Sequence, residues 1–402
     1  MDYDYPLTEG HIAQFPLENR EGSRLLINQN GTLSESTFSN IAHFLPSDSL
    51  LVFNDTKVIR ARLNFRKPTG APIEIFCLEP FPPGESLETA FKQVRNCTWK
   101  CLVGNLKRWK SGTLQMTTGG PELGITLNAV LKQDLGDGSF AIDFNWAPPE
   151  KSFSEILEEA GSVPLPPYIR RKTVPSDAAR YQTIFAAHEG SVAAPTAGLH
   201  FTEPVMGLLR EKGIGITKVT LHVGVGTFRP VTVANIHHHI MHHEKIMVTK
   251  KTVQELLNHS DRPVIAVGTT AARALESLYW IGAQIIQGKN QINPVVQQWE
   301  PYRENELPVV GTREALLGLM AFLDKRRMTE LQAETQLIIV PGYTFKIIHG
   351  IITNFHLPKS TLLLLVAAMI GDDWKNAYQY ALQNNFRFLS YGDSCLFFDH
   401  SR

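Results

Sequence analysis

The spacing of apolar residues changes twice along this chain, and that change limits the possible folds more than any other feature. Between about residues 61 and 146, short alternating segments are separated by turn residues such as Pro68-Thr69-Gly70 and Gly136-Asp137-Gly138. On both sides of this region, apolar runs lead through short polar loops into segments with helix-capping residues. The pattern predicts an α/β fold: a discontinuous α/β domain interrupted by a small, barrel-like all-β domain.

The expected boundaries follow from these changes in period. We expect the first part of the α/β domain at residues 1–62, the β domain at 63–150 and the second part at 151–402, with an insertion at about 280–334. The insertion is expected to be irregular and polar from Trp280 and then helical up to Lys325-Arg326-Arg327. The predicted β-domain strands are Ile73–Phe76, Trp99–Val103, Leu114–Met116, Ile125–Leu131 and Phe140–Phe144.

Three units outside the β domain combine a strand with a helix. Thr202 is expected to cap a helix that runs to about Lys212 and is followed by a strand at Ile214–Val223. The apolar run Val264–Val267 leads into a helix, and Ile347–Ile352 leads to another, which Ser360 is expected to cap. In such sheets, ligands gather where strands end and helices begin.

Charge and cysteine content exclude several classes of protein. The 39 Lys and Arg residues balance 39 Asp and Glu residues, so nucleic acid would have to be bound through local basic patches. The longest apolar run, Leu362–Ile370, is far shorter than the roughly 18 residues that a membrane span needs, and the amino terminus lacks signal-peptide features. We therefore expect a cytoplasmic protein without a membrane partner. The four cysteines are expected to be reduced, with Cys97 and Cys101 in the core of a strand.

Two glycine-rich segments contain the first candidates for a site. In Val192–Phe201, Thr196 and His200 lie just before a predicted helix, although a turn with a capping histidine explains the segment equally well. In Leu221–Pro230, alternation along the strand places His222 on the face opposite Leu221, directly before the Gly224–Gly226 turn. A nucleotide loop is the alternative there, but Pro230 interrupts any helix that would follow.

A run of histidines, residues 237–243, suggests a metal site. On a helix, His238 and His242, or His239 and His243, would share one face. The HExxH pattern is absent and the nearest carboxylate, Glu244, is at the wrong end, so we favour a polar surface segment and expect no metal.

Several further polar groups are candidates for binding or for simple turns and caps. The loops are Asn54-Asp55-Thr56, Thr269-Thr270 and Tyr391-Gly392-Asp393. The basic patches are Arg20 with Arg24, Lys107-Arg108-Trp109-Lys110, Arg170-Arg171-Lys172 and Lys325-Arg326-Arg327. Trp109 and Tyr168 lie beside two of these patches, a combination of cation and aromatic ring that suits RNA.

Taken together, these segments resemble the S-adenosylmethionine:tRNA ribosyltransferase-isomerase family of queuosine biosynthesis. The matching segments run in order along the chain: IAQFPLENREGSRLL (12–26), LLVFNDTKVIRARL (50–63), PLPPYIRR (164–171), VAAPTAGLHF (192–201), VTLHVGVGTFRPV (219–231), HIMHHE (239–244), VIAVGTTAARALES (264–277), PGYTFKIIHGIITNFHLPKSTLLLL (341–365) and FRFLSYGDSCLF (386–397). The resemblance implies an α/β domain split by a β-barrel domain. It also implies transfer and isomerisation of the ribosyl part of S-adenosylmethionine onto the 7-aminomethyl-7-deazaguanine base at the tRNA wobble position.

The resemblance also implies particular partners and particular site residues. The partners would be tRNA carrying that base and S-adenosylmethionine, which is consumed to adenine and methionine, with no metal or separate cofactor. The reaction needs a base beside the sulfonium and an acid for the departing adenine, and histidines serve near pH 7. The expected catalytic residues are His200, His222 and Asp393; the expected substrate-binding residues are Arg24, Asn54, Asp55, Thr196, Arg229, Thr269, Thr270, Arg273 and His356.

Three departures leave other functions open. Arg60 replaces a usual proline, Ala271 replaces a usual Ser or Thr, and the segment 280–334 is longer than the family's connection by roughly 35 residues. The alternatives are an S-adenosylmethionine-dependent RNA methyltransferase and a non-catalytic tRNA-binding paralogue.

Overall fold

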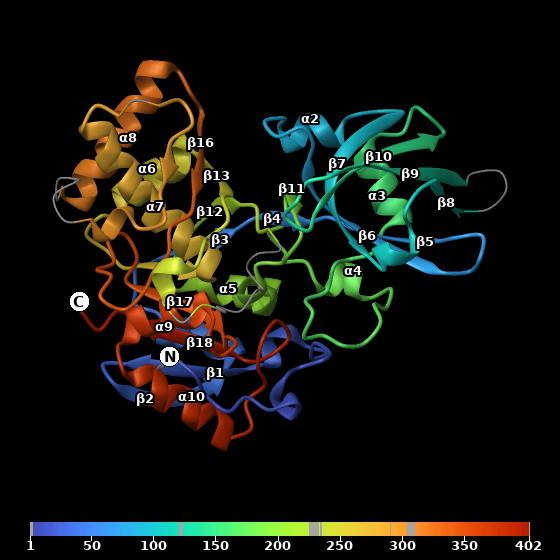
Figure 1. Ribbon diagram of the computed structural model, residues 1–402. Coiled ribbons are helices and arrows are strands. Elements are labelled where there is room, and N and C mark those ends of the chain that lie inside the picture. Colours follow the sequence, from blue (N-terminus) through green and yellow to red (C-terminus); the bar gives the residue numbers. More distant parts are fainter. Residues whose placement is uncertain are drawn as a thin grey trace.

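The computed structural model consists of a large α/β lobe and a smaller β lobe that projects from it (Figure 1). The structure describes residues 3–119, 124–224, 233, 235–289, 291–303 and 310–401. Both ends of the chain lie on the α/β lobe, and the β lobe is inserted between its first and later strands.

A ten-stranded mixed sheet forms the centre of the α/β lobe, in the order β15-β16-β13-β12-β3-β14-β17-β18-β1-β2. Its middle strands are parallel: β12 (Gly215–Leu221), β3 (Leu50–Asn54), β14 (Val264–Val267) and β17 (Gly350–Asn354). The outer strands are β15 (Val295–Val296), β16 (Glu330–Thr335), β13 (Glu244–Thr249), β18 (Ser394–Phe398), β1 (Arg24–Gln29) and β2 (Thr32–Thr37). β3, β14 and β17 are buried along their whole length, as expected for parallel strands covered on both faces.

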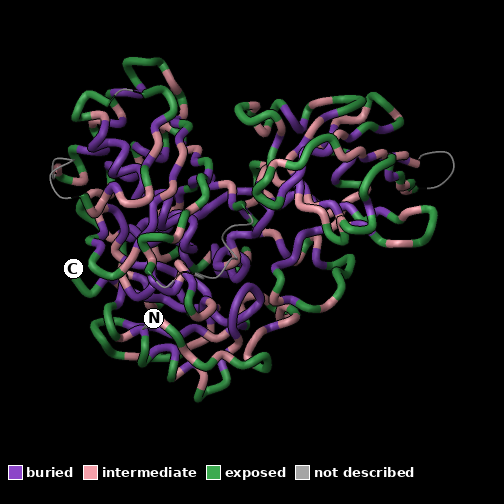
Figure 2. The backbone as a smooth tube through the Cα atoms, in the orientation of Figure 1, coloured by how far each residue is buried: buried purple, intermediate pink, exposed green. Residues whose placement is uncertain are grey.

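Helices cover both faces of this sheet, and successive strand residues contribute to two different cores. Along β3, Leu50 and Val52 belong to one core, whereas Leu51 and Phe53 belong to the other. The first core includes side chains of α6 (Lys250–Asn258), α7 (Thr269–Ile286), α8 (Thr312–Arg326), α9 (Thr361–Ile370) and α10 (Asp373–Gln383). The second includes α1 (Ile41–Phe44) and α5 (Glu203–Glu211). Figure 2 shows the buried backbone in the interior of this lobe.

The β lobe is a six-stranded antiparallel sheet in the order β5-β6-β7-β10-β9-β8. Its strands are β5 (Arg62–Arg66), β6 (Pro72–Pro80), β7 (Asn96–Gly104), β8 (Thr113–Thr118), β9 (Ile125–Asp134) and β10 (Phe140–Ala147). β5 and β8, at the two ends of this order, also contact each other, so the sheet curls almost into a barrel. Helices α2 (Leu87–Phe91) and α3 (Phe153–Ala160) pack on it, and α3 begins with a capping box at Ser152 and Glu155.

A short parallel pair, β4 (Thr56–Val58) and β11 (His188–Ser191), lies where the two lobes meet. The remaining short α-helix is α4 (Asp177–Arg180). Arg60, the residue that replaces a usual proline, lies at the start of the β lobe and forms an ion pair with Glu158 at 2.8 Å. It therefore ties the outgoing and returning connections of the β lobe together.

The predicted fold class is confirmed, and most predicted elements are found close to their expected places. Cys97 and Cys101 are buried on β7, as expected, and all four cysteines are free. Two expectations were wrong. Trp280 does not begin the irregular segment, because its apolar neighbours continue α7 to Ile286. Thr202 occupies the position before α5, but its hydroxyl makes no capping bond. The predicted domain boundaries stay a prediction.

Among the described residues, no helix is both long and apolar enough to cross a membrane.

Candidate active site

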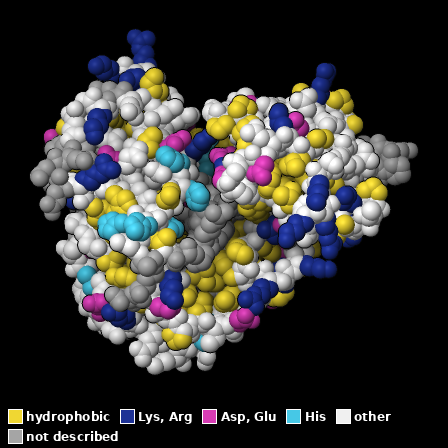
Figure 3. Space-filling view, viewed as in Figure 1, with side chains coloured by type: hydrophobic (Ala, Val, Ile, Leu, Met, Phe, Trp, Pro, Cys, Tyr) yellow, Lys and Arg dark blue, Asp and Glu magenta, His cyan; other side chains and the backbone are white. Residues whose placement is uncertain are grey.

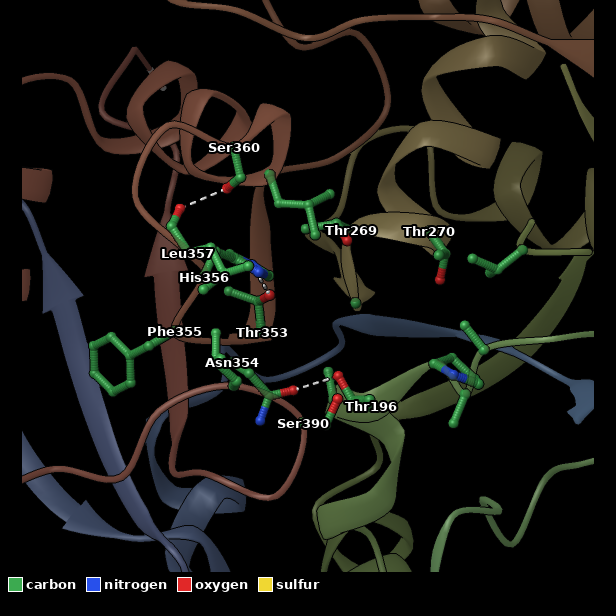
Figure 4. Close-up of a pocket in the computed structure, with 18 of the residues that line it drawn as sticks. Thr196, Thr269, Thr270, Thr353, Asn354, Phe355, His356, Leu357, Ser360 and Ser390 are labelled. Carbon is green, nitrogen blue, oxygen red and sulfur yellow. Dashed lines mark hydrogen bonds between the residues drawn. The ribbon is translucent and has the colours of Figure 1, made fainter. Parts of the chain in front are cut away.

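A pocket lies at the carboxyl ends of the parallel strands, where the sequence pattern predicts a ligand (Figure 4). It holds about 750 Å³ of space, counting the part open to solvent. Residues from the ends of β12, β14 and β17 line it, together with the 3₁₀ turn Thr196–His200 and the loop at Ser390. Thr196, Thr269, Thr270 and His356, all predicted as substrate-binding, lie together in this pocket.

The lining of the pocket is uncharged and largely apolar, with hydroxyl groups spread over it. Hydroxyl groups come from Thr196, Thr269, Thr270, Thr353, Ser360, Ser390 and Tyr168, and the described lining residues include no Asp, Glu, Lys or Arg. Helix α7 begins at the pocket after Gly268, which has a φ of 92° and has no side chain to cap the helix. The first N–H groups of α7 are therefore available to an anionic group of a ligand.

Asn354 connects the pocket to the buried His200. Its side-chain oxygen accepts a hydrogen bond from the Thr196 hydroxyl at 2.8 Å, and its amide nitrogen lies 3.0 Å from Nε2 of His200. Nδ1 of His200 lies 2.8 Å from the hydroxyl of Ser23. This network assigns the proton of the imidazole to Nδ1 and leaves Nε2 as an acceptor.

Burial keeps the imidazoles near the pocket neutral. Desolvation lowers the pKa of His200 to about 4 and that of His356 to about 3. His356 lines the pocket, with Nε2 at 2.9 Å from the hydroxyl of Thr353. Around neutral pH, both rings can therefore accept or relay a hydrogen bond, but burial disfavours the protonated form that a general acid needs.

His222 lies in a different cavity, the cleft between the two lobes. Its Nδ1 is 3.0 Å from the hydroxyl of Thr56, and burial, aided by the neighbouring His188 and Lys245, lowers its pKa to about 4. The next residue, Val223, lines the pocket, so the end of β12 separates the cleft from the pocket. His200 lines a smaller third cavity, together with Arg20 and Ser23, so the structure places His200 and His222 on different cavities.

The cleft is larger than the pocket and carries charges of both signs. It holds about 1970 Å³ of space, counting the part open to solvent, between α2 of the β lobe and strands β13 and β16 of the α/β lobe. Its charged and imidazole side chains are Glu79, Glu85, Glu88, Lys92, His188, Glu189, His222, His243, Lys245, Glu330 and Glu334. Figure 3 shows this hollow between the lobes.

Two other predicted residues hold the strands beside the pocket. Asn54 accepts a hydrogen bond from the backbone of Leu221 at 3.1 Å and donates to the carbonyl of Leu221 at 2.9 Å. Asp55 accepts a 2.7 Å hydrogen bond from Thr220. Both side chains are buried, and they fix the end of β12 from which His222 projects.

Three further predicted residues that the structure describes, Arg24, Asp393 and Arg273, do not line the pocket either. The Arg24 guanidinium pairs with Glu35 at 2.7 Å and lies over the ring of Phe386. The carboxylate of Asp393 accepts hydrogen bonds from two backbone N–H groups, and burial raises its pKa. Arg273 is buried in an ion pair with Glu244. Arg229 lies outside the described residues.

The structure bears on two surface segments, and the expectation that Trp109 could stack on RNA was wrong. The histidine run does not form the helix that a shared metal-binding face would require, because only Ile236–His238 is helical, as a single 3₁₀ turn. Trp109 is not available to stack on RNA, because its ring is 1% exposed in the β-lobe core and its indole N–H donates to Gly112. Lys107, Arg108 and Lys110 themselves are exposed.

The sequence analysis missed Asn354, Ser390 and Thr353 as pocket residues. The signal for Asn354 and Thr353 was available, because both directly follow the apolar part of β17 at the carboxyl end of a parallel strand. Nothing comparable marks Ser390, which reaches the pocket only because the chain folds back beside the first residues.

Comparison with known proteins assigns this chain to a family. The family described as "Queuosine biosynthesis protein" matches residues 1–397. The S-adenosylmethionine:tRNA ribosyltransferase-isomerase of Halothermothrix orenii is 39% identical over 401 residues, covering 98% of each chain. The enzyme of the same name from Geotalea uraniireducens is 38% identical over 400 residues, again covering 98% of each chain. The crystal structure of S-adenosylmethionine tRNA ribosyltransferase from Thermotoga maritima has 28% identity and a TM-score of 0.46, with 98% of this chain and 99% of that chain covered.

Proposed function

This chain belongs to the S-adenosylmethionine:tRNA ribosyltransferase-isomerase family, and on that premise we propose that its pocket binds S-adenosylmethionine and its cleft receives the tRNA. The activity of the family is transfer of the ribosyl part of S-adenosylmethionine to tRNA in queuosine biosynthesis, producing epoxyqueuosine. The RNA substrate is tRNA with 7-aminomethyl-7-deazaguanine at the wobble position, and adenine and methionine are released.

The placement of S-adenosylmethionine in the pocket rests on one observation: the lining is uncharged, and the only anion-binding groups offered by the described lining are the uncapped N–H groups at the first turn of α7. The methionine carboxylate of S-adenosylmethionine would bind the N–H groups at the start of α7, beside Thr269 and Thr270. The ribose hydroxyls would meet the hydroxyl and amide groups of Thr196, Asn354 and Ser390. Arg229 and Arg273 stay predictions as carboxylate ligands.

In this proposal, His222 serves the RNA substrate, whereas His200 and His356 serve S-adenosylmethionine. His222 faces the cleft, where the amine of the RNA base arrives, and a neutral imidazole can accept a proton there. His200 positions Asn354 against the ribose through the 3.0 Å contact. His356 borders the pocket as a neutral hydrogen-bonding partner. Asp393 supports this loop through its backbone, because its carbonyl accepts a hydrogen bond from Asn354.

The exposed Lys107, Arg108 and Lys110 of the β lobe would contact tRNA phosphates. Because the whole chain has a formal net charge of zero, RNA affinity must come from such local groups. We also infer that the enzyme works in the cytoplasm, where tRNA is modified.

The test is product analysis with the purified chain, S-adenosylmethionine and tRNA that carries the aminomethyl base. Free adenine and methionine are expected only when both substrates are present. S-adenosylhomocysteine would instead show a methyltransferase, and RNA binding without consumption of S-adenosylmethionine would show a non-catalytic paralogue.

A further inference from the structure

The histidine run packs against a short segment of the insertion, residues 297–302. Gln298 of this segment donates to the carbonyl of His239 at 2.6 Å and accepts from the backbone N–H of Met241 at 2.9 Å. The ring of Trp299 lies 4.4 Å from the imidazole of His237, tilted by 35°. Two segments far apart in the sequence therefore form one continuous surface.

Hydrogen bonds behind Trp299 hold this surface in place. Tyr302, whose ring meets Trp299 edge-on at 5.5 Å, donates to the carbonyl of Ile338 and accepts from the N–H of Val340. The buried Glu300 accepts hydrogen bonds from Gln284 and from the backbone of Gln297. A surface that is already ordered loses little conformational freedom when a ligand binds.

The surface is accessible and borders the cleft. His237, His238, His242 and His243 are exposed, and Ile240 between them is 76% exposed. His243 also lines the cleft, together with Lys245. Figure 3 shows histidine side chains gathered on the α/β lobe beside the hollow.

We propose that Trp299, His237, His238, Ile240 and His242, here called the histidine–tryptophan surface, bind the RNA substrate beside the cleft. Trp299 and His237 would stack on an unpaired base, because every base presents a flat face to an aromatic ring. The neighbouring imidazoles would donate hydrogen bonds to phosphate oxygens. This inference rests on the proposed function, which brings RNA to the adjoining cleft.

The charges around this surface are compatible with RNA. A carboxylate oxygen of Glu334 lies 3.1 Å from Nδ1 of His243, Glu244 is buried against Arg273, and Glu300 is buried in its own hydrogen bonds. Arg303, at the end of the same segment, is exposed and positive, as is Lys245 on β13. The carboxylates Glu330 and Glu334 lie on β16, toward the cleft. RNA phosphates would therefore lie over the imidazoles, away from β16.

The experiment uses the full chain and a fluorescent anticodon stem-loop RNA that carries 7-aminomethyl-7-deazaguanine at the wobble position. Trp299→Ala is expected to weaken RNA binding by about tenfold, the scale of one lost base stack, and to raise the KM for RNA. The KM for S-adenosylmethionine and the kcat at saturating RNA should not change. Trp299→Phe and His237→Phe should retain most of the affinity, whereas His237→Ala should lower it.

Leu317→Ala is the matched control, because Leu317 is exposed on α8 of the same insertion and outside this surface. Unchanged RNA affinity in a folded Trp299→Ala protein would overturn the inference, as would an equal loss in Leu317→Ala. Adenine release by the wild-type protein is a separate test of the proposed function. If no adenine is released, the proposed function is contradicted, but an RNA affinity that depends on Trp299 would still support RNA binding at the histidine–tryptophan surface.

Discussion

The pocket and the cleft lie on opposite sides of the end of β12, yet they are built differently. The pocket is bordered by the ends of buried strands and uses neutral hydroxyl, amide and imidazole groups. The cleft lies between two lobes and is lined by carboxylates, lysines and histidines, several of them in ion pairs. A small substrate needs fixed, desolvated partners, whereas a large polyanion needs accessible groups that water and salt can reach. We base the proposed division of labour between the two cavities on this contrast.

The largest effect should come from the two histidines that flank the pocket. His222→Ala and His200→Ala should each lower the turnover rate by about 10² to 10⁴, the range for lost proton transfer or positioning. The measurement is adenine release with both substrates saturating, and His43→Ala, which alters an exposed histidine on α1, is the control. Rates near those of the wild type in folded variants would reassign both histidines to structure.

A sharper test of the pocket is Asn354→Ala. This change removes the acceptor for Thr196 and the partner of Nε2 of His200, so the ribose should bind out of position. We expect turnover to fall by about 10², with S-adenosylmethionine binding, measured by calorimetry, also weakened. Asn258→Ala, on the exposed side of α6, should leave both unchanged. If Asn354→Ala altered only RNA binding, the assignment of the two cavities would be reversed.

The proposed RNA contacts of the β lobe are tested by salt dependence. Changing Lys107, Arg108 and Lys110 to alanine together should weaken tRNA binding and flatten the slope of log K against log salt by about one unit for each phosphate that these side chains neutralise. The KM for S-adenosylmethionine should stay constant. If tRNA affinity and slope are unchanged, the β lobe is not the anticodon-arm platform, and Lys325, Arg326 and Arg327 at the end of α8 become the next patch to test.

The dependence of the free energy of unfolding on pH should show the effect of the buried His200. The pKa of His200 is about 4 in the folded protein, whereas an exposed imidazole has a pKa of 6.5, so the unfolded chain binds the proton more readily. The free energy of unfolding should therefore fall as pH drops from about 6.5 to 4, by on the order of 3 kcal/mol from this group, and be independent of its titration above that window.

The raised pKa values of Asp393 and Glu276 act in the opposite direction, because their protonated forms are favoured by folding. The difference between wild type and His200→Gln isolates the histidine. Urea unfolding at several pH values should show a shallower pH slope for His200→Gln. Parallel slopes would mean that folding does not lower the pKa of His200.

The smallest effect is expected from removing metals. The run at residues 237–243 lacks the helix that would bring two imidazoles together, and the described residues contain no group of three or more His, Cys, Asp or Glu side chains that could hold a metal. Dialysis against a chelator should leave adenine release unchanged. If the chelator inhibits adenine release and added zinc reverses the inhibition, the enzyme has a metal centre, and the comparison of the two cavities must include it.

Much of the site could be predicted from the position of polar residues after apolar runs. Thr196, Thr269, Thr270 and His356 were found in this way, because the ends of parallel strands meet at one edge of a sheet. Arg273 shows the limit of this reasoning. Its place on the first turns of α7 suggests a ligand for a carboxylate, but the neighbouring Glu244 occupies its guanidinium. A single sequence does not show which side chain from a distant strand will lie opposite it.

The sequence by itself determined the alternation of strands and helices, the inserted β domain and the membership in the family, because these depend on local periodicity and on ordered motifs. The separation of His200 from His222 was decided only by the tertiary structure. Both histidines lie beside glycine turns and look equivalent in sequence, but β12 and the connection through β4 and β11 direct them to different cavities. Which cavity a side chain faces depends on how strands pair across long distances in the chain, and that pairing is a property of the packed sheet.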